Sequence, residues 1–263
     1  MAPSPDGVLA PYVASVSAYD VALGPAGVHR GLPGTTLTFV LPVGEPLDVG
    51  WAGDPASRAR RWSTVSGLHA HPAEIHHDGH QAGVQLELTT AGARALFGLP
   101  AAALAGELLE LEDVAPWLRT LPERLHEAPA HAWVAVVEHT LAAALVDVPA
   151  ARAEVGRALA RLTRGAGVQE VADEVGYSRR HLAGLVRAEC GLAPKQVQRL
   201  GRFEASRSLM GRLPLAEVAY RCGYADQAHL TREWSALAGC PPTTWLREEF
   251  PFLQDLDARA AGG

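Results

Sequence analysis

One motif occurs twice in the second half of the chain, and this repeat restricts the fold more than any other feature. Residues 171–177 (VADEVGY) reappear as residues 218–224 (VAYRCGY), an offset of 47 positions. After one inserted residue the offset becomes 48, and three further pairs match: His181 with His229, Gly191 with Gly239, and Pro194 with Pro242. Repetition on this scale predicts one supersecondary unit that is built twice.

Each copy has the pattern of two short helices joined by a tight turn. Gly176 follows an apolar stripe at helical spacing and supplies the left-handed backbone that ends a helix. Ser178 is a good N-cap for the next helix, and Asp226 takes that place in the second copy. The inward residues of the second helices are Leu182, Leu185 and Val186 in one copy and Leu230, Trp234 and Leu237 in the other.

Two interpretations of such a unit are open. It is either a helical hairpin that serves only packing or a helix-turn-helix. Two copies with the same caps, glycines and polar outward faces favour the helix-turn-helix, which places its second helix in the major groove of DNA. Charge supports this reading. Residues 1–150 carry seven arginines, no lysine and 16 acidic residues, a net charge of −9, whereas residues 151–247 carry 15 basic and nine acidic residues, a net charge of +6. A basic module of this kind favours nucleic acid as a partner, although a solvated basic surface has the same composition.

The repeated residues resemble the DNA-binding domain of the AraC/XylS family of transcriptional regulators over about residues 150–250. The second copy carries the family pattern almost throughout, in residues 218–224 (VAYRCGY), 230–234 (LTREW) and 239–245 (GCPPTTW), with Leu230 where the family usually has Phe. The resemblance implies a seven-helix domain in which a linker helix, here residues 194–210, joins two helix-turn-helix units. It implies a sequence-specific transcription factor that binds promoter or operator DNA and is not an enzyme.

The second helix of each helix-turn-helix unit is here called its reading helix. The outward positions of the two reading helices are the candidate DNA contacts. A linker helix of this length spans about 25 Å, which suits reading helices in successive major grooves about 34 Å apart. Arginine pairs bidentately with guanine and glutamine with adenine. Ala183 and Gly184 are small where the family commonly has longer side chains, so we expect the first copy to read bases mainly with Arg179 and Arg180. The candidate DNA-binding residues are Ser178, Arg179, Arg180, Gly184, Arg187, Asp226, Gln227, His229, Thr231 and Arg232.

Several neighbouring residues have two interpretations each. Arg199 is either solvated surface or a phosphate clamp, and Arg202 is either structural or a phosphate contact. His181 and His229 fit packing or capping roles better than catalysis, and His229 is also placed to approach DNA.

The first half of the chain alternates between short strands and then turns helical. Leu37, Phe39 and Leu41 share one face of a predicted strand at 36–41, and a second strand is predicted at 84–88. Weaker strands are 47–51 and 62–66, and helices are predicted at 90–97, 112–127 and 131–146. The fold class is α+β, with a small β-sheet or barrel-like N-terminal domain flanked by helices and an all-α C-terminal domain.

The expected domain boundaries follow from these patterns. An N-terminal sensing or dimerisation domain takes residues 1–148, with its strands in 35–90 and its helices in 90–146. A DNA-binding domain takes residues 149–250, beginning near Pro149, and an acidic tail takes residues 251–263. The first half resembles the N-terminal halves of actinobacterial-type regulators of the same family, at residues 29–33 (HRGLP) and 92–100 (GARALFGLP).

The partners expected besides DNA are a small-molecule effector, a second copy of the chain and RNA polymerase. Phe39, Trp51 and Trp62 either line a small effector pocket or form the core. Helix 131–146 is either a dimer seam or packs within the chain.

Five histidines lie within residues 69–80, and imidazoles are common metal ligands. The weak metal candidates are His69, His71, His76 and His77, and the alternative function is a metal-binding, cupin-like enzyme or sensor fused to a DNA-binding domain. His69-Ala70-His71 followed by Glu74 resembles a cupin metal motif, but the glutamate comes too early and no second cupin motif follows. A strand-and-turn surface with solvated histidines is the favoured explanation of the cluster, so we predict no cofactor.

Cysteine usage and hydropathy exclude other classes of protein. No cysteine precedes Cys190, which excludes a DNA-alkyl repair regulator of the Ada type and a cysteine amidotransferase in the first half. No apolar run approaches the ~18 residues of a membrane span, and the first residues lack the pattern of a secretory signal. A cytoplasmic protein with no membrane partner is therefore expected.

Overall fold

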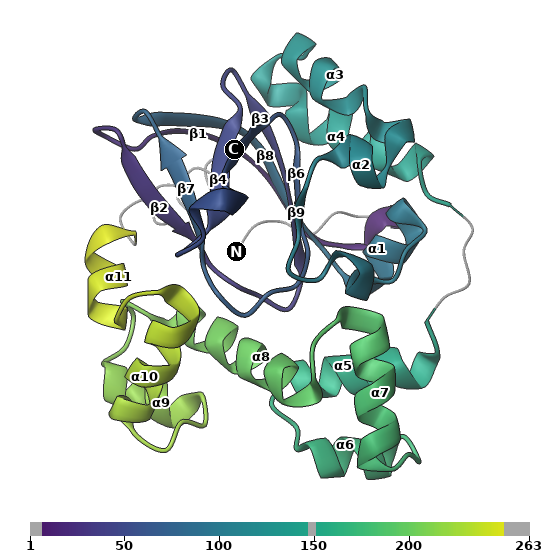
Figure 1. The fold of residues 1–263 in the computed structure, drawn as a ribbon, viewed down its shortest axis with the longest axis vertical. Coiled ribbons are helices and arrows are strands. Elements are labelled where there is room, and N and C mark those ends of the chain that lie inside the picture. Colours follow the sequence, from purple (N-terminus) through teal and green to yellow (C-terminus); the bar gives the residue numbers. More distant parts are fainter. Residues whose placement is uncertain (1–6, 147–150, 250–263) are drawn as a thin grey trace.

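Two antiparallel sheets form the centre of the N-terminal domain in the computed structural model, which describes residues 7–146 and 151–249 (Figure 1). The first sheet has the order β1 (Val13–Ala22), β8 (His80–Leu88), β3 (Leu37–Val43), β6 (Thr64–Ser66) and β9 (Leu108–Leu109). The second has the order β2 (Gly27–Gly31), β7 (Ala73–His77), β4 (Leu47–Trp51) and β5 (Ala59–Arg61).

Alternating side chains bury one face of each sheet, as the sequence pattern predicts. Leu37, Phe39 and Leu41 of β3 are fully buried, and the second sheet packs Leu47 and Val49 of β4 into a smaller cluster. The helices α1 (Thr90–Phe97), α3 (Leu121–Glu127) and α4 (Trp133–Ala143) pack against the first sheet. Trp133, Val137 and Leu141 are the buried residues of α4, so the face that they form packs within the chain.

The structure corrects three predictions for the first half. Strands begin well before residue 35, since β1 and β2 precede it, and β9 lies among the predicted helices. The predicted helix 112–127 is divided into α2 (Leu111–Val114), a 3-10 turn (Pro116–Leu118) and α3, because Pro116 and Pro122 each stand in the first turn of a new helix. The boundary near Pro149 and the tail 251–263 lie outside the described residues.

Seven helices follow residue 150 in the part of the chain that the structure describes, as the resemblance implies. The first unit holds α6 (Val168–Glu174) and α7 (Arg179–Cys190), and the second holds α9 (Leu215–Arg221) and α10 (Gln227–Ala238). The linker helix α8 (Pro194–Leu209) runs between the units, and α5 (Ala153–Thr163) and α11 (Pro242–Glu248) complete the domain (Figure 1).

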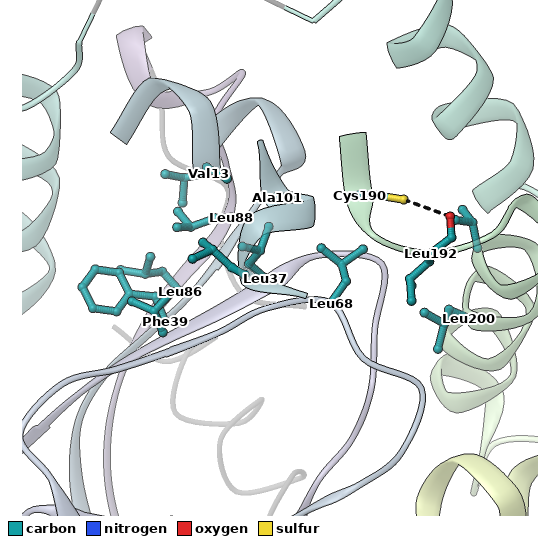
Figure 2. Packing of buried hydrophobic residues seen from close by; sticks show 14 of the residues in the cluster. Val13, Leu37, Phe39, Leu68, Leu86, Leu88, Ala101, Cys190, Leu192 and Leu200 are labelled. Atoms are coloured by element: carbon teal, nitrogen blue, oxygen red, sulfur yellow. Dashed lines mark hydrogen bonds between the residues drawn. The ribbon is translucent and has the colours of Figure 1, made fainter. Parts of the chain in front are cut away.

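The hydrophobic core is continuous between the two domains. Leu68 and Ala101 of the N-terminal domain belong to the same buried cluster as Cys190, Leu192 and Leu200 of the C-terminal domain (Figure 2). Within the described residues, no helix is long and apolar enough to cross a membrane.

Candidate nucleic-acid interface

The turns of the two helix-turn-helix units are built from the residues that the repeat identifies. Gly176 and Gly223 have left-handed φ angles of 73° and 71° at the end of the first helices. The Ser178 hydroxyl accepts the backbone N–H of His181 at 3.2 Å, and the Asp226 carboxylate accepts that of His229 at 2.6 Å. Both predicted N-caps are therefore confirmed, and each reading helix begins at a defined residue.

The inward faces of α7 and α10 hold the reading helices on the domain core. The side chains of Leu182, Val186, Leu230, Trp234 and Leu237 are buried, whereas Leu185, predicted as inward, is only half-buried. The ring of Trp234 lies 4.7 Å from that of Phe203 in the linker helix and 5.3 Å from that of Trp245 in α11. The orientation of α10 is thus fixed by large aromatic contacts.

The outward faces of α7 and α10 carry several exposed arginines. Arg179, Arg180 and Arg187 of α7 and Arg232 of α10 are exposed, and within the described part of the chain no hydrogen bond or ion pair engages their side chains. Gly184 is exposed between them, and a Cβ added there would meet nothing within 4 Å. Gln227 is exposed, while His229 and Thr231 are partly exposed on α10. The predicted contact residues therefore lie at the N-terminal ends and outer faces of the two reading helices.

Two arginines of the linker helix have a structural role instead. Glu233 of α10 accepts hydrogen bonds from Arg199 Nε at 2.8 Å and from Arg202 Nη2 at 3.1 Å. The Arg202 guanidinium also lies 4.9 Å from the centre of the Tyr224 ring, a cation–π contact. These contacts join α10 to α8, so a phosphate-clamp role for Arg199 or Arg202 would require the ion pair to open.

A tyrosine–histidine pair packs at the start of each reading helix. The rings of Tyr177 and His181 meet edge to face at 4.7 Å, and those of Tyr224 and His229 at 5.4 Å. The backbone N–H of Ala225 donates to His229 Nδ1 at 3.2 Å, so the neutral imidazole carries its hydrogen on Nε2. The packing interpretation of both histidines is confirmed. The tyrosines belong to the repeated motif, but their contact with the histidines was not predicted.

The histidines of the N-terminal domain do not form one site. His69 is buried beside Trp51, its Nδ1 lies 2.6 Å from the His71 carbonyl oxygen, and burial lowers the pKa of His69 to about 4. His77 of β7 packs instead against His29 of β2, at 5.6 Å between ring centres, and burial lowers the pKa of both.

His76 lies opposite Asp48 in the β4–β7 pair. Among residues 7–146 and 151–249, no three His, Cys, Asp or Glu side chains are grouped as a metal site would need. His69, His71, His76 and His77 are thus candidates that the fold separates into two groups.

A cavity of about 650 Å³ opens among the ends of β1, β3, β4, β7 and β8. Its walls combine Tyr19, Val28 and Leu47 with the charged side chains of Arg58 and Arg60. Asp48 pairs with Arg58 at 2.7 Å. None of the three aromatic residues considered for a pocket lines this cavity. Phe39 is fully buried, so the core alternative holds for it, whereas Trp51 packs between His69 and His71 and Trp62 is 45% exposed.

A family profile described as "Helix-turn-helix domain" matches residues 151–248, the segment that contains α5 to α11. Residues 151–248 therefore form a helix-turn-helix domain of the AraC type. No curated protein matches this chain.

The chain is similar in fold to solved structures of ToxT from Vibrio cholerae. An apo form of ToxT from strain SCE256, with one lysine replaced by alanine, has a TM-score of 0.53 and 12% identity, and the match covers 89% of this chain and 97% of that one. ToxT from strain O395 has a TM-score of 0.50 and 11% identity over the same shares. The DNA-binding domain of AdpA in complex with a target DNA is 24% identical, covers 36% of this chain and 92% of that one, and has a TM-score of 0.32.

Polar contacts between the two domains are a feature that no sequence pattern indicates. Arg94 pairs with Glu189 at 2.7 Å, and Thr35 donates from both its backbone N–H and its hydroxyl to Glu204 at 2.8 and 2.7 Å. Arg30 pairs with Glu249 at 3.0 Å. The partners are 95 to 219 residues apart in sequence, beyond any helical or strand period.

Proposed function

We propose that this protein is a transcription regulator that recognises a specific operator by placing the N-terminal ends of α7 and α10 in two successive major grooves. The observation that carries the proposal is the repeat itself, realised as two units with the same cap, the same glycine turns and an exposed first turn. Four exposed arginines on these helices have no protein partner in the described residues, so their charge is available to DNA.

The two reading helices would use different contacts. In α7, Arg179 and Arg180 occupy the first turn, where side chains reach base edges, and Gly184 allows the helix backbone to approach the duplex closely. In α10, Gln227, Thr231 and Arg232 present one amide, one hydroxyl and one guanidinium for pairing with bases. Ser178 and Asp226 act through their caps, which fix the direction of each helix.

Selection of bound sequences from a random DNA library tests the proposal. The full chain is expected to enrich one sequence with two half-sites about one helical turn apart. The double variant Arg180→Ala/Arg232→Ala should lose that enrichment. Arg157→Ala is the matched control, because Arg157 is an exposed arginine of α5 that lies on neither reading helix. Enrichment of no sequence by the wild-type chain at low salt would overturn the proposal.

We further propose that the cavity of the N-terminal domain binds a small amphipathic effector. Its volume of about 650 Å³ lies in the ordinary range of ligand sites, and apolar walls stand beside guanidinium groups. The fluorescence of a lipophilic probe and the shift of the melting temperature with decanoate measure binding. Ala82→Phe, which narrows the cavity from β8, should remove both signals, whereas Ala135→Phe on the exposed face of α4 should leave them unchanged.

A further inference from the structure

Gly191 and Gly239 are matching residues of the repeat, and each ends its reading helix with a left-handed backbone. Each of them also touches the N-terminal domain. A Cβ added to Gly191 would lie 2.3 Å from Ala105 Cβ, closer than such atoms approach, and a Cβ added to Gly239 would lie 3.1 Å from Pro72 Cγ. The C-terminal ends of both reading helices therefore abut the same neighbouring domain.

The other two glycines of the repeat do not share this contact. Gly176 and Gly223 have nearly the same left-handed φ angles, yet a Cβ added to either would meet nothing within 4 Å. The close approach to the N-terminal domain thus occurs only at the C-terminal ends of the reading helices among these four glycines. A left-handed backbone alone does not require it.

Further contacts surround both docking points. Beside Gly191, the short helix η3 (Ala101–Leu104) packs on α7, and the carboxylate of Glu189 accepts hydrogen bonds from Arg94. On the side of the second unit, Arg30 of β2 pairs with Glu249 just after α11. The linker helix is held between them through Glu204, which accepts two hydrogen bonds from Thr35.

In all of these interdomain hydrogen bonds, one domain supplies the acceptors and the other supplies the donors. The carboxylates come from the DNA-binding domain, on α7, on α8 and after α11, and the donors come from the N-terminal domain. The N-terminal domain lies over α8, with the two units at opposite ends of that helix (Figure 1). One body therefore holds both reading helices at the ends away from their exposed first turns.

We propose that the N-terminal domain positions the two reading helices, and that Gly191 and Gly239 are the positioning residues that let it dock against both C-terminal ends. The docking sets the separation of the two first turns and so the half-site spacing that the regulator prefers. This inference rests on the proposed reading of DNA by α7 and α10, and it adds a determinant of specificity that does not touch DNA.

The substitution Gly191→Ala tests the docking of the first unit, and Gly176→Ala is its matched control. Both place alanine on a left-handed backbone and carry the same strain. Only Gly191→Ala also drives a methyl group into Ala105. The additional substitution Ala105→Gly removes the methyl group with which the new Cβ clashes, so it should restore the docking of the first unit. Gly239→Ala with its control Gly223→Ala repeats the test on the second unit, where the contact is milder.

The readout is affinity for operators whose half-sites are moved apart or together by single base pairs, measured by fluorescence anisotropy with the full chain. Wild type and Gly176→Ala should prefer one spacing. In Gly191→Ala that preference should fall about fivefold, and Gly191→Ala/Ala105→Gly should regain it. Equal spacing preference in Gly191→Ala and Gly176→Ala, or no rescue by Ala105→Gly, would overturn the inference.

Circular dichroism and melting curves show whether each variant folds. If Gly191→Ala does not fold, the inference is tested by comparing the spacing preference of Gly239→Ala with that of its control Gly223→Ala, and equal preferences would overturn it. A wild-type chain that selects no DNA sequence would instead overturn the proposed function, so the two failures are distinguishable.

Discussion

Arg94 and Glu189 form a two-pronged ion pair across the domain interface, with Arg94 Nε 2.9 Å and Nη2 2.7 Å from the carboxylate oxygens. The Glu189 side chain is 6% exposed and that of Arg94 is 26% exposed. A carboxylate so far removed from water is tolerated only because the guanidinium satisfies both of its oxygens. The C-terminal turn of α7 is thereby tied to α1, at the same end of α7 as Gly191.

Removing the guanidinium should destabilise the protein more than removing the pair. Arg94→Met leaves the Glu189 carboxylate buried without its partner, and we expect the free energy of unfolding to fall by about 2–3 kcal/mol. In Arg94→Met/Glu189→Gln the uncompensated charge is absent, so the loss should be smaller. Urea denaturation of the single variants and the double variant measures the coupling. Equal losses in Arg94→Met and the double variant would contradict a buried, coupled pair.

Glu233 should govern the ratio of specific to non-specific DNA binding. Glu233→Gln frees Arg199 and Arg202, which adds positive charge near the duplex and strengthens non-specific binding. It also loosens α10 from α8, which weakens specific binding. We expect the specificity ratio to fall about tenfold, with a steeper dependence of non-specific affinity on salt.

Glu217→Gln is the control for Glu233→Gln, since Glu217 pairs with Arg221 within the same helix, α9. It makes the same change in net charge and should leave specific binding nearly unchanged. An equal loss of specificity in both variants would show that the effect comes from the change in net charge and does not depend on how Glu233 positions α10.

The C-terminal domain could be predicted from sequence because its constraints are local and occur twice. Gly176 and Ser178 signal a helix end and a helix start within three residues, and the second copy repeats the signal with Gly223 and Asp226. The linker helix at 194–210 is implied by the resemblance to the AraC/XylS family, and α8 ends one residue before that. The candidate contact residues are outward for the same reason, since a cap and an apolar stripe together fix which side of a helix faces solvent.

The N-terminal domain was harder to predict because its pairings are distant in sequence. β1 pairs along its length with β8, 58 to 75 residues later, and the residue types of Ser17, Ala18 and Tyr19 lack the strict polar–apolar alternation that identifies a strand. The interdomain contacts are more distant still. Glu189 and Glu204 resemble any acidic residue on a helix until the fold brings Arg94 and Thr35 against them.

Acid should destabilise the N-terminal domain through His69. Burial lowers the pKa of His69 from 6.5 to about 4, so the folded state keeps this imidazole neutral while the unfolded chain takes up a proton near pH 6.5. The stabilisation is complete above pH 6.5 and is lost as the pH falls toward 4. Between pH 7 and pH 5 the loss is about 1–2 kcal/mol from this group.

His69→Gln keeps a donor for the His71 carbonyl and does not titrate, so its unfolding free energy should fall less between pH 7 and pH 5 than that of wild type. His139→Gln, on the exposed face of α4, should fall as much as wild type. His29 remains in both variants and contributes its own part, because burial lowers its pKa to about 4 as well. An unchanged pH dependence in His69→Gln would mean that this imidazole is not held neutral.

Alanine substitutions of Arg232 and Arg187 should affect DNA binding in different ways. Arg232 lies in the second turn of α10, where a guanidinium reaches base edges, so Arg232→Ala should cost about 1–3 kcal/mol of binding and relax specificity at one base pair. Arg187 lies near the C-terminal end of α7, where the helix leaves the groove, so Arg187→Ala should weaken binding to all sequences alike and lower the salt slope by about one. Affinities for the selected operator and its single-base variants at several salt concentrations separate these outcomes. A uniform loss across sequences in Arg232→Ala would reassign that arginine to the phosphate backbone.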